Sequence, residues 1–156
     1  CHARSGAPLL PRYRIPPYGR ERFACDAGLS QQLCAAAKAA LAGFHRQLGA
    51  VMGVAGHTVH QGLIASGDRF VSAAQESLAL QGVLAAAGHL PLAVEMEGAA
   101  VAQVCFDYDV PFAAVRTISD RADDQAHVDF PKFISEVASR YALAIISDLM
   151  MRLAKR

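Results

Sequence analysis

The chain has 156 residues, enough for one domain with a buried core, and 53% of them are hydrophobic, which excludes a disordered segment. Its net charge of +1 comes from scattered lysines and arginines, without the basic stripe of a nucleic-acid-binding surface, so no nucleic-acid partner is expected. No apolar run approaches the roughly 18 residues of a membrane-spanning helix, and no membrane partner is expected either.

In the first half of the chain, residues 1–28 are predicted to be irregular, because their prolines and glycines interrupt regular hydrogen bonding. Apolar residues at helical spacing then predict a helix over 29–48. A first strand is expected from about 58 to 66. A short helix over 75–87 follows and ends at Gly88.

In the second half, strands are predicted over 92–95 and 112–118, with a helix over 97–108 between them. A polar loop over 119–129 precedes a long closing helix over 131–155. Alternating strands and helices favour an α/β fold with a parallel sheet and right-handed crossovers. The closing helix carries an apolar stripe with a repeat of four, formed by Phe133, Val137, Tyr141, Ile145 and Leu149.

The four cysteines predict a reducing, cytoplasmic setting. Cys1, Cys25, Cys34 and Cys105 form no CxxC pair, and no histidine stands at metal-ligand spacing from them. Cys34 and Cys105 fall inside helical patterns and are expected to be buried as small hydrophobic residues. Neither a metal nor an organic cofactor is expected.

Polar or acidic clusters follow all three predicted strands, at 66–70, 95–98 and 119–120. Because ligands bind at the carboxyl ends of the strands in open α/β sheets, the three clusters are expected to converge on one crevice. The pattern predicts an enzyme pocket built around Glu97 and Asp120.

Glu95 and Glu97 are two residues apart, so at the end of a strand their side chains point the same way, with Met96 opposite. The first turn of the following helix favours an ionised carboxylate at Glu97. An ionised carboxylate accepts the two hydrogen bonds that a sugar diol donates, which makes both glutamates candidate substrate ligands. The alternative is that both only cap the helix.

Asp120 is expected to be desolvated and close to Glu97, and both effects raise the pKa of a carboxyl group. A carboxylic acid that stays protonated near neutral pH is a candidate general acid. An N-cap or Asx-turn at the strand end is the alternative role. Phe70, Met96 and Phe130 flank the acidic residues and suit a planar heterocycle joined to a sugar, although such residues are more often part of a core.

Three stretches of the chain resemble the 5′-methylthioadenosine/S-adenosylhomocysteine nucleosidases of the nucleoside phosphorylase superfamily. They are Ile64-Ala-Ser-Gly-Asp-Arg-Phe-Val71, Ala93-Val-Glu-Met-Glu-Gly-Ala-Ala100 and Val110-Pro-Phe-Ala-Ala-Val-Arg-Thr-Ile-Ser-Asp-Arg-Ala-Asp123. The second and third are shared across much of the superfamily. The continuation through Ala126-His127, Asp129-Phe130 and Phe133 is more similar to the nucleosidase branch.

The resemblance implies a three-layer α/β/α fold of which residues 1–156 form the C-terminal two-thirds, a single-domain fragment whose N-terminal strands are missing. It implies hydrolysis of the N-glycosidic bond of 5′-methylthioadenosine or S-adenosylhomocysteine, which releases adenine in methionine salvage. It also implies a homodimer in which a neighbour completes the alkylthio end of the pocket, and Leu9 to Tyr18 is the candidate segment.

Carried over to this sequence, the resemblance implies that Asp120 protonates N7 of adenine and that Ser119 orients it. Glu97 would hold the ribose hydroxyls, with Met96 beneath the ribose. Arg116 is expected to be a structural partner of the acidic cluster. In the adenine site, Phe70 and Phe130 would sandwich the base and the backbone at Val71 would read its edge.

One part of the family pattern is missing from this sequence. The family activates the attacking water with a glutamate after the first strand of its sheet, and neither Glu21 nor Glu76 stands in a matching context. Activity of this chain alone, and the preferred 5′ substituent, are therefore left open. The alternatives are a purine nucleoside phosphorylase or another purine nucleosidase, and a non-catalytic module that binds adenine nucleosides.

Overall fold

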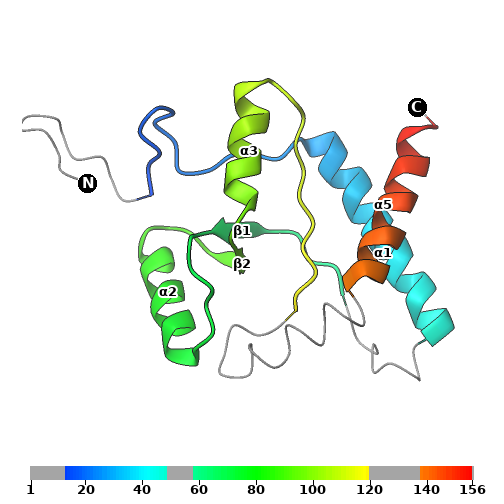
Figure 1. Ribbon diagram of the computed structural model, residues 1–156, viewed down its shortest axis with the longest axis horizontal. Helices are drawn as coiled ribbons and strands as arrows, with labels where there is room; N and C mark the ends of the chain where they lie inside the picture. Colours follow the sequence, from blue (N-terminus) through cyan, green and yellow to red (C-terminus); the bar gives the residue numbers. More distant parts are fainter. Residues whose placement is uncertain (1–12, 49–57, 120–137, 156) are drawn as a thin grey trace, which may run out of the picture.

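The computed structural model describes residues 13–48, 58–119 and 138–155. Helices and strands alternate along most of the described chain (Figure 1). The elements are α1 (Ala27–Leu48), β1 (Leu63–Ser66), α2 (Ala74–Ala86), β2 (Pro91–Glu95), α3 (Gly98–Asp107) and α5 (Ser139–Leu153). All four predicted helices are present where the structure describes them, and α5 begins after the start expected for the closing helix, whose residues 131–137 lie outside the described part.

The two strands form a parallel sheet, as the alternation of elements predicted. Ser66 lies opposite Glu95 at the carboxyl end of the register, and the Gly67 N–H donates to the Glu95 carbonyl at 3.0 Å. β1 is shorter than the strand expected over 58–66. Because both strands end at the same edge, the residues that follow them come together there.

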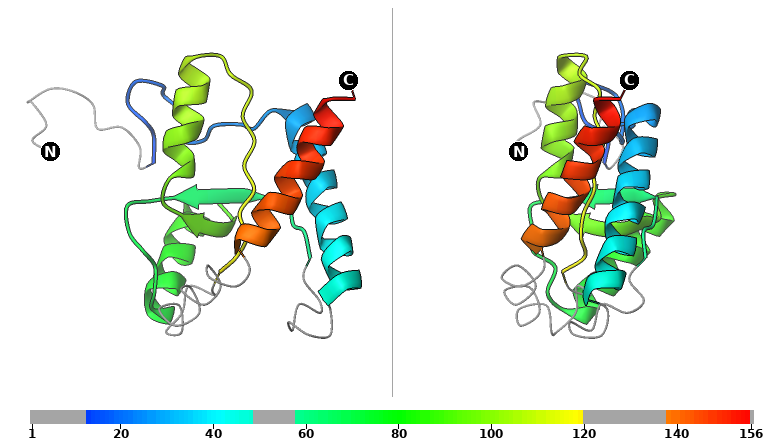
Figure 2. Two further views of the ribbon diagram at one scale, coloured as in Figure 1. Left: turned by 45° about the vertical axis from the view of Figure 1, so that its right-hand side comes forward. Right: turned by 90° about the vertical axis from the view of Figure 1, so that its right-hand side faces the viewer.

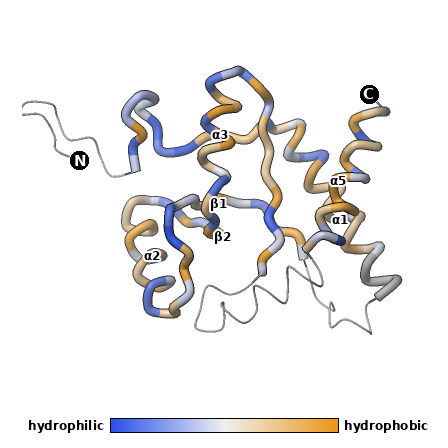
Figure 3. The backbone as a smooth tube through the Cα atoms, viewed as in Figure 1, coloured by the Kyte–Doolittle hydropathy of each residue, from blue (hydrophilic) through white to orange (hydrophobic). Residues whose placement is uncertain are grey.

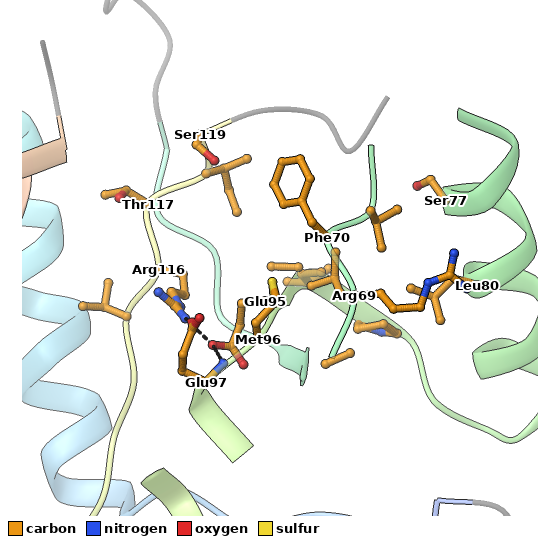
Figure 4. Close-up of a pocket in the computed structure, with 18 of the residues that line it drawn as sticks. Arg69, Phe70, Ser77, Leu80, Glu95, Met96, Glu97, Arg116, Thr117 and Ser119 are labelled. Atoms are coloured by element: carbon orange, nitrogen blue, oxygen red, sulfur yellow. Dashed lines mark hydrogen bonds and ion pairs between the residues drawn. The ribbon is translucent and has the colours of Figure 1, made fainter. Parts of the chain in front are cut away.

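The third strand predicted over 112–118 is not formed. Residues 111–119 run without strand pairing, and the Phe112 carbonyl accepts a hydrogen bond of 2.7 Å from the Asp26 N–H, outside the sheet. The apolar run therefore follows the turn before α1 instead of extending β1 or β2. It still carries Arg116 and Ser119 to the carboxyl edge of the sheet, as Figure 4 shows.

The core lies between α1 and α5, which are side by side in both views of Figure 2. Every fourth residue of α5 points into it, and the stripe predicted from the sequence is confirmed for the three members that the structure describes. Small residues on α1 allow the two helices to approach closely. The buried side chains are Leu33, Ala36, Ala37, Tyr141, Ile145 and Leu149.

The described segment before α1 is irregular, as predicted, and mostly hydrophilic (Figure 3). Side-chain hydrogen bonds anchor it to α3 and to the end of α2. The Tyr18 hydroxyl donates to the Asp107 carboxylate at 2.8 Å. Arg22 donates from Nε to Nδ1 of the buried His89 at 3.1 Å and from Nη2 to the Gly88 carbonyl at 2.9 Å. The segment is thereby held against α3 and the turn that ends α2.

The thiols of Cys25, Cys34 and Cys105 are free. Cys34 and Cys105 are half-buried, so neither is as fully enclosed as expected. Within the described residues, the helices are too short or too polar to cross a membrane.

Candidate active site

A cavity of about 980 Å³ opens at the carboxyl edge of the sheet. Its floor is formed by the ends of the two strands, and residues 115–119 and α2 form its sides (Figure 4). The predicted site residues within the described part all line it: Phe70, Val71, Glu95, Met96, Glu97 and Ser119. The volume is of the size expected for a small-molecule site.

Glu95 is the buried member of the acidic pair, with 8% of its side chain exposed. Its carboxylate accepts hydrogen bonds from the backbone N–H of Glu97 at 3.1 Å and of Gly98 at 2.8 and 2.9 Å. The Ser66 hydroxyl and the Arg116 guanidinium also donate to it. Glu95 therefore caps the N-terminus of α3, where free N–H groups favour a negative charge.

Burial raises the pKa of the Glu95 carboxyl, but the donors around it outweigh burial. Hydrogen bonds from Arg116, from Ser66 and from the N–H groups of Gly98 and Glu97 lower the pKa to about 2. The same carboxylate, followed by that of Glu97, raises the pKa of the Arg116 guanidinium. Both groups are charged at neutral pH.

Glu97 is the exposed member of the pair, with 70% of its side chain exposed. Although it is the N-cap residue of α3, its side chain makes no capping hydrogen bond. Its carboxylate accepts instead from Nη2 of Arg116 at 2.5 Å, and Figure 4 shows it turned toward that guanidinium. The Glu95 side chain therefore caps the helix, and the Glu97 side chain does not.

The wall above the acidic pair is apolar. Figure 4 shows the Met96 side chain reaching into the cavity below the Phe70 ring, and both side chains are partly exposed there. Val71 is buried in the same wall, and Ser119 lies at the far side. The arrangement places an ionised carboxylate beside an apolar surface, which suits a ligand with a planar ring and a polyhydroxylated part.

Asp120 and Phe130, the predicted general acid and second aromatic residue, lie outside the described residues. Ser119, which directly precedes Asp120, lines the cavity.

The two upstream glutamates are engaged elsewhere. Glu21 lies 3.2 Å from Nε2 of His89, and Glu76 pairs with Arg69 at 2.6 Å. Neither of them lines the cavity. In the described residues no group of three or more histidines, cysteines or acidic residues could hold a metal ion.

Two contributors to the site were not singled out as site residues from the sequence. Ser66 donates to Glu95 and accepts from the Ala99 N–H at 2.8 Å. The sequence indicates Ser66 only as part of the polar cluster after the first strand. Gly98 approaches Glu95 so closely that a Cβ atom there would lie 2.8 Å from Oε1. Both residues stand next to predicted strand ends, which is the only sequence signal that could have pointed to them. Their partner, the Glu95 carboxylate, is evident only from the three-dimensional structure.

Comparison with known proteins finds relatives that are nucleosidases. The chain is 41% identical over 97 residues to a 5′-methylthioadenosine/S-adenosylhomocysteine nucleosidase of Haemophilus ducreyi, an alignment that covers 61% of this chain and 39% of the relative. The nucleosidase of Streptococcus pneumoniae, solved with the transition-state inhibitor MT-ImmA, is similar with a TM-score of 0.63 and 30% identity, over 85% of this chain and 49% of that one.

Two further structures are similar. The S-adenosylhomocysteine nucleosidase of Streptococcus pyogenes, in complex with 5-methylthiotubericidin, gives a TM-score of 0.61 and 31% identity, over 87% of this chain and 51% of that one. A futalosine hydrolase of Helicobacter pylori gives 0.57 and 31%, over 79% of this chain and 46% of that one.

The chain thus spans about half the length, or less, of these relatives. The family model of the phosphorylase superfamily matches residues 4–150, nearly the whole sequence. The α/β fold predicted from the alternating elements is the phosphorylase-like fold of these structures. The chain belongs to the phosphorylase superfamily.

Proposed function

We propose that this chain provides the adenine-nucleoside site of a nucleosidase that splits the N-glycosidic bond of 5′-methylthioadenosine or S-adenosylhomocysteine. The observation that carries the proposal is the exposed Glu97 carboxylate, held by Arg116 in a cavity whose opposite wall is formed by Met96 and Phe70. A carboxylate in that place can accept both hydroxyls of a ribose while the base lies against the apolar wall.

The reaction breaks the bond between C1′ of the ribose and N9 of adenine, and the electron pair leaves with the base. Asp120 supplies a proton to N7, so adenine departs as a neutral molecule. Water adds its oxygen to C1′, and the proton that it loses passes through solvent to restore the carboxylic acid of Asp120. Glu97 stabilises the positive charge that develops on the sugar, because its carboxylate is fixed before the charge appears.

Phe70 and Phe130 are proposed to stack on the two faces of adenine, with Val71 at its edge and Ser119 orienting Asp120. The position of Phe70 in the cavity wall supports its part in this arrangement. Stacking on aromatic rings is favourable for any planar base, so the backbone at Val71 would select adenine by its hydrogen bonds.

The test is adenine release from 5′-methylthioadenosine by the full chain, with Asp120→Asn as the catalytic variant and Asp148→Asn on α5 as its matched control. We expect Asp120→Asn to lower release by about 100-fold or more, and Asp148→Asn to leave it unchanged. Equal release by both variants would contradict the role of Asp120. Binding of the nucleoside without any release would favour a binding module, and absence of both would overturn the proposal.

A second candidate substrate is futalosine, because the fold is also similar to a futalosine hydrolase. A phosphorylase is the other alternative, in which phosphate replaces water at C1′. Release of base from both nucleosides, with and without inorganic phosphate, separates these activities. Phosphate-dependent release would identify a phosphorylase, and preference for futalosine would identify the other hydrolase.

A cytoplasmic homodimer completes the proposal. The structure describes Tyr13 to Tyr18 of the segment that is expected to reach a neighbour's pocket, and none of these six residues lines the cavity of its own chain. The free thiols at Cys25, Cys34 and Cys105 support a reducing compartment. Sedimentation of the full chain at increasing concentration tests the dimer, and a monomer at all concentrations would contradict it.

A further inference from the structure

The hydrogen-bonding capacity of the Glu95 carboxylate is fully used within the protein. Oε1 accepts from Ser66 and from the Gly98 N–H, and Oε2 accepts from the N–H groups of Glu97 and Gly98 and from Arg116. A carboxylate has about four lone-pair directions, so no acceptor position is left for a sugar hydroxyl. Glu95 lines the cavity but is not free to bind substrate there.

Ser66 links three parts of the structure through one oxygen atom. It ends β1, its hydroxyl donates to Glu95 at the end of β2, and the same oxygen accepts from the Ala99 N–H in the first turn of α3. Since the hydroxyl both donates and accepts, removing it leaves a buried carboxylate and a helix N–H each short of one partner. Ser66 therefore sets where the Glu95 carboxylate lies.

Gly98 fixes the same carboxylate from the other side. A Cβ atom at this position would lie 2.8 Å from Oε1 and 3.1 Å from both Cδ and Oε2 of Glu95. Any side chain at 98 would push the carboxylate away from Arg116. By contrast, a Cβ at Gly82 in the middle of α2 would meet no atom within 4 Å.

We propose that Ser66 and Glu95 are positioning residues that act through Arg116 on Glu97. Ser66 fixes Glu95, Glu95 holds one side of the guanidinium, and the guanidinium orients the exposed carboxylate of Glu97 toward the ribose. The proposal rests on the proposed function, and it assigns Glu95 an indirect role in place of direct contact with substrate.

The test compares the affinities of the full chain for adenine and for 5′-methylthioadenosine. The difference between the two affinities, called the sugar gain below, reports on the contact of Glu97 with the ribose. The affinity for adenine alone reports on the rest of the site. We expect Ser66→Ala to weaken binding of the nucleoside about tenfold, the effect of one lost hydrogen bond to a charged group, and to leave adenine binding unchanged. Ser66→Thr, which keeps the hydroxyl, should restore the nucleoside affinity.

Gly98→Ala should act like Ser66→Ala, with Gly82→Ala as the matched control that leaves both affinities unchanged. A loss shared equally by adenine and nucleoside would show a merely structural role and overturn the proposal. If the wild type binds the nucleoside more tightly than adenine and Ser66→Ala keeps that difference, the sugar gain, the positioning role alone would be overturned. A wild-type chain that binds both ligands equally would overturn the proposed function and this proposal together.

A measurement without ligand gives an independent readout. In ¹⁵N-labelled protein, a guanidinium held by two carboxylates gives separate Nη signals, because its rotation is slowed. We expect the Arg116 signals, assigned with Arg116→Lys, to be separate in the wild type and in Ser66→Thr and to merge in Ser66→Ala. Separate signals in Ser66→Ala would overturn the proposal whatever the ligands do.

Discussion

Arg116 holds the carboxylate of Glu97 at 2.5 Å, although 70% of the Glu97 side chain is exposed. An exposed ion pair of this kind adds little to stability, because solvent screens the charges and ordering two side chains costs entropy. The same guanidinium also pairs with the buried Glu95. Glu95 therefore fixes the position of the guanidinium, and the guanidinium in turn orients Glu97. The pair is better explained by preorganisation of the cavity than by stability.

The first prediction concerns this guanidinium. Arg116→Ala should weaken binding of 5′-methylthioadenosine about tenfold or more, because Glu97 is no longer oriented and the buried charge of Glu95 loses its partner. Isothermal titration of the full chain measures the change. Arg152→Ala is the matched control, since Arg152 pairs with Asp148 on α5 and neither of the two lines the cavity. Equal affinities in the two variants would contradict the prediction.

The second prediction is a pH dependence of stability that comes from Glu95. Its pKa is lowered from 4.5 to about 2 in the folded chain, so the folded state favours the ionised form. The resulting stability is fully present above the unfolded value and is lost as the pH falls toward the folded value. It amounts to at most about 3 kcal/mol at neutral pH.

Urea unfolding of the wild type and of Glu95→Gln at about pH 7 and about pH 3 measures this contribution. The variant should be less stable at the higher pH, and the difference between the two proteins should shrink at the lower pH. Glu76→Gln, which removes a carboxylate from a more exposed pair with Arg69, is the control and should show a smaller change. A constant difference across the two pH values would contradict the assignment.

Sequence patterns were sufficient where local periodicity decides the structure. The apolar repeat in α5 correctly predicted that Tyr141, Ile145 and Leu149 are buried, because a helix brings every fourth residue to one face. The alternation of strands and helices correctly predicted the parallel pairing of β1 with β2. The polar clusters after these strands correctly predicted one shared cavity.

Sequence patterns failed where a contact between distant segments decides the structure. The run from 112 to 118 has the composition of a strand, but its Phe112 carbonyl pairs with the Asp26 N–H, a contact that composition does not encode. The sequence also did not show that Glu95 is the buried glutamate that caps α3, because both glutamates were expected to point the same way at the strand end. This difference depends on Ser66, whose hydroxyl selects one carboxylate.

The third prediction compares two adjacent isoleucines on α5. Ile145 is 5% exposed in the core against α1, whereas Ile146 is 48% exposed and lies outside that core. Ile145→Ala should destabilise the chain by about 2 to 5 kcal/mol, because it removes buried methyl groups and leaves a cavity. Ile146→Ala should change stability by about 0.5 kcal/mol. Thermal unfolding distinguishes them, and equal losses would mean that the exposed face of α5 is covered in solution.

The last prediction concerns the Arg22 clasp, the hydrogen bonds from Arg22 to His89 and Gly88 that hold the segment before α1. Nδ1 of His89 accepts from Nε of Arg22 at 3.1 Å, which leaves the proton of a neutral ring on Nε2, facing Glu21 at 3.2 Å. Arg22→Ala removes the donor to Nδ1 and the donor to the Gly88 carbonyl together. A buried imidazole nitrogen without a donor costs about 1 to 3 kcal/mol, so the segment should open more often.

Hydrogen exchange measures this opening directly. The N–H groups of Ile15 and Gly19 are hydrogen-bonded within the segment, at 2.9 Å each, and should exchange faster in Arg22→Ala while the amides of α1 and α5 keep their protection. Lys38→Ala, which removes a cation from an exposed position on α1, should change neither set. Faster exchange throughout the chain would mean that the clasp supports the whole fold. Unchanged exchange at Ile15 and Gly19 would mean that the contact of Tyr18 with Asp107 is sufficient to hold the segment.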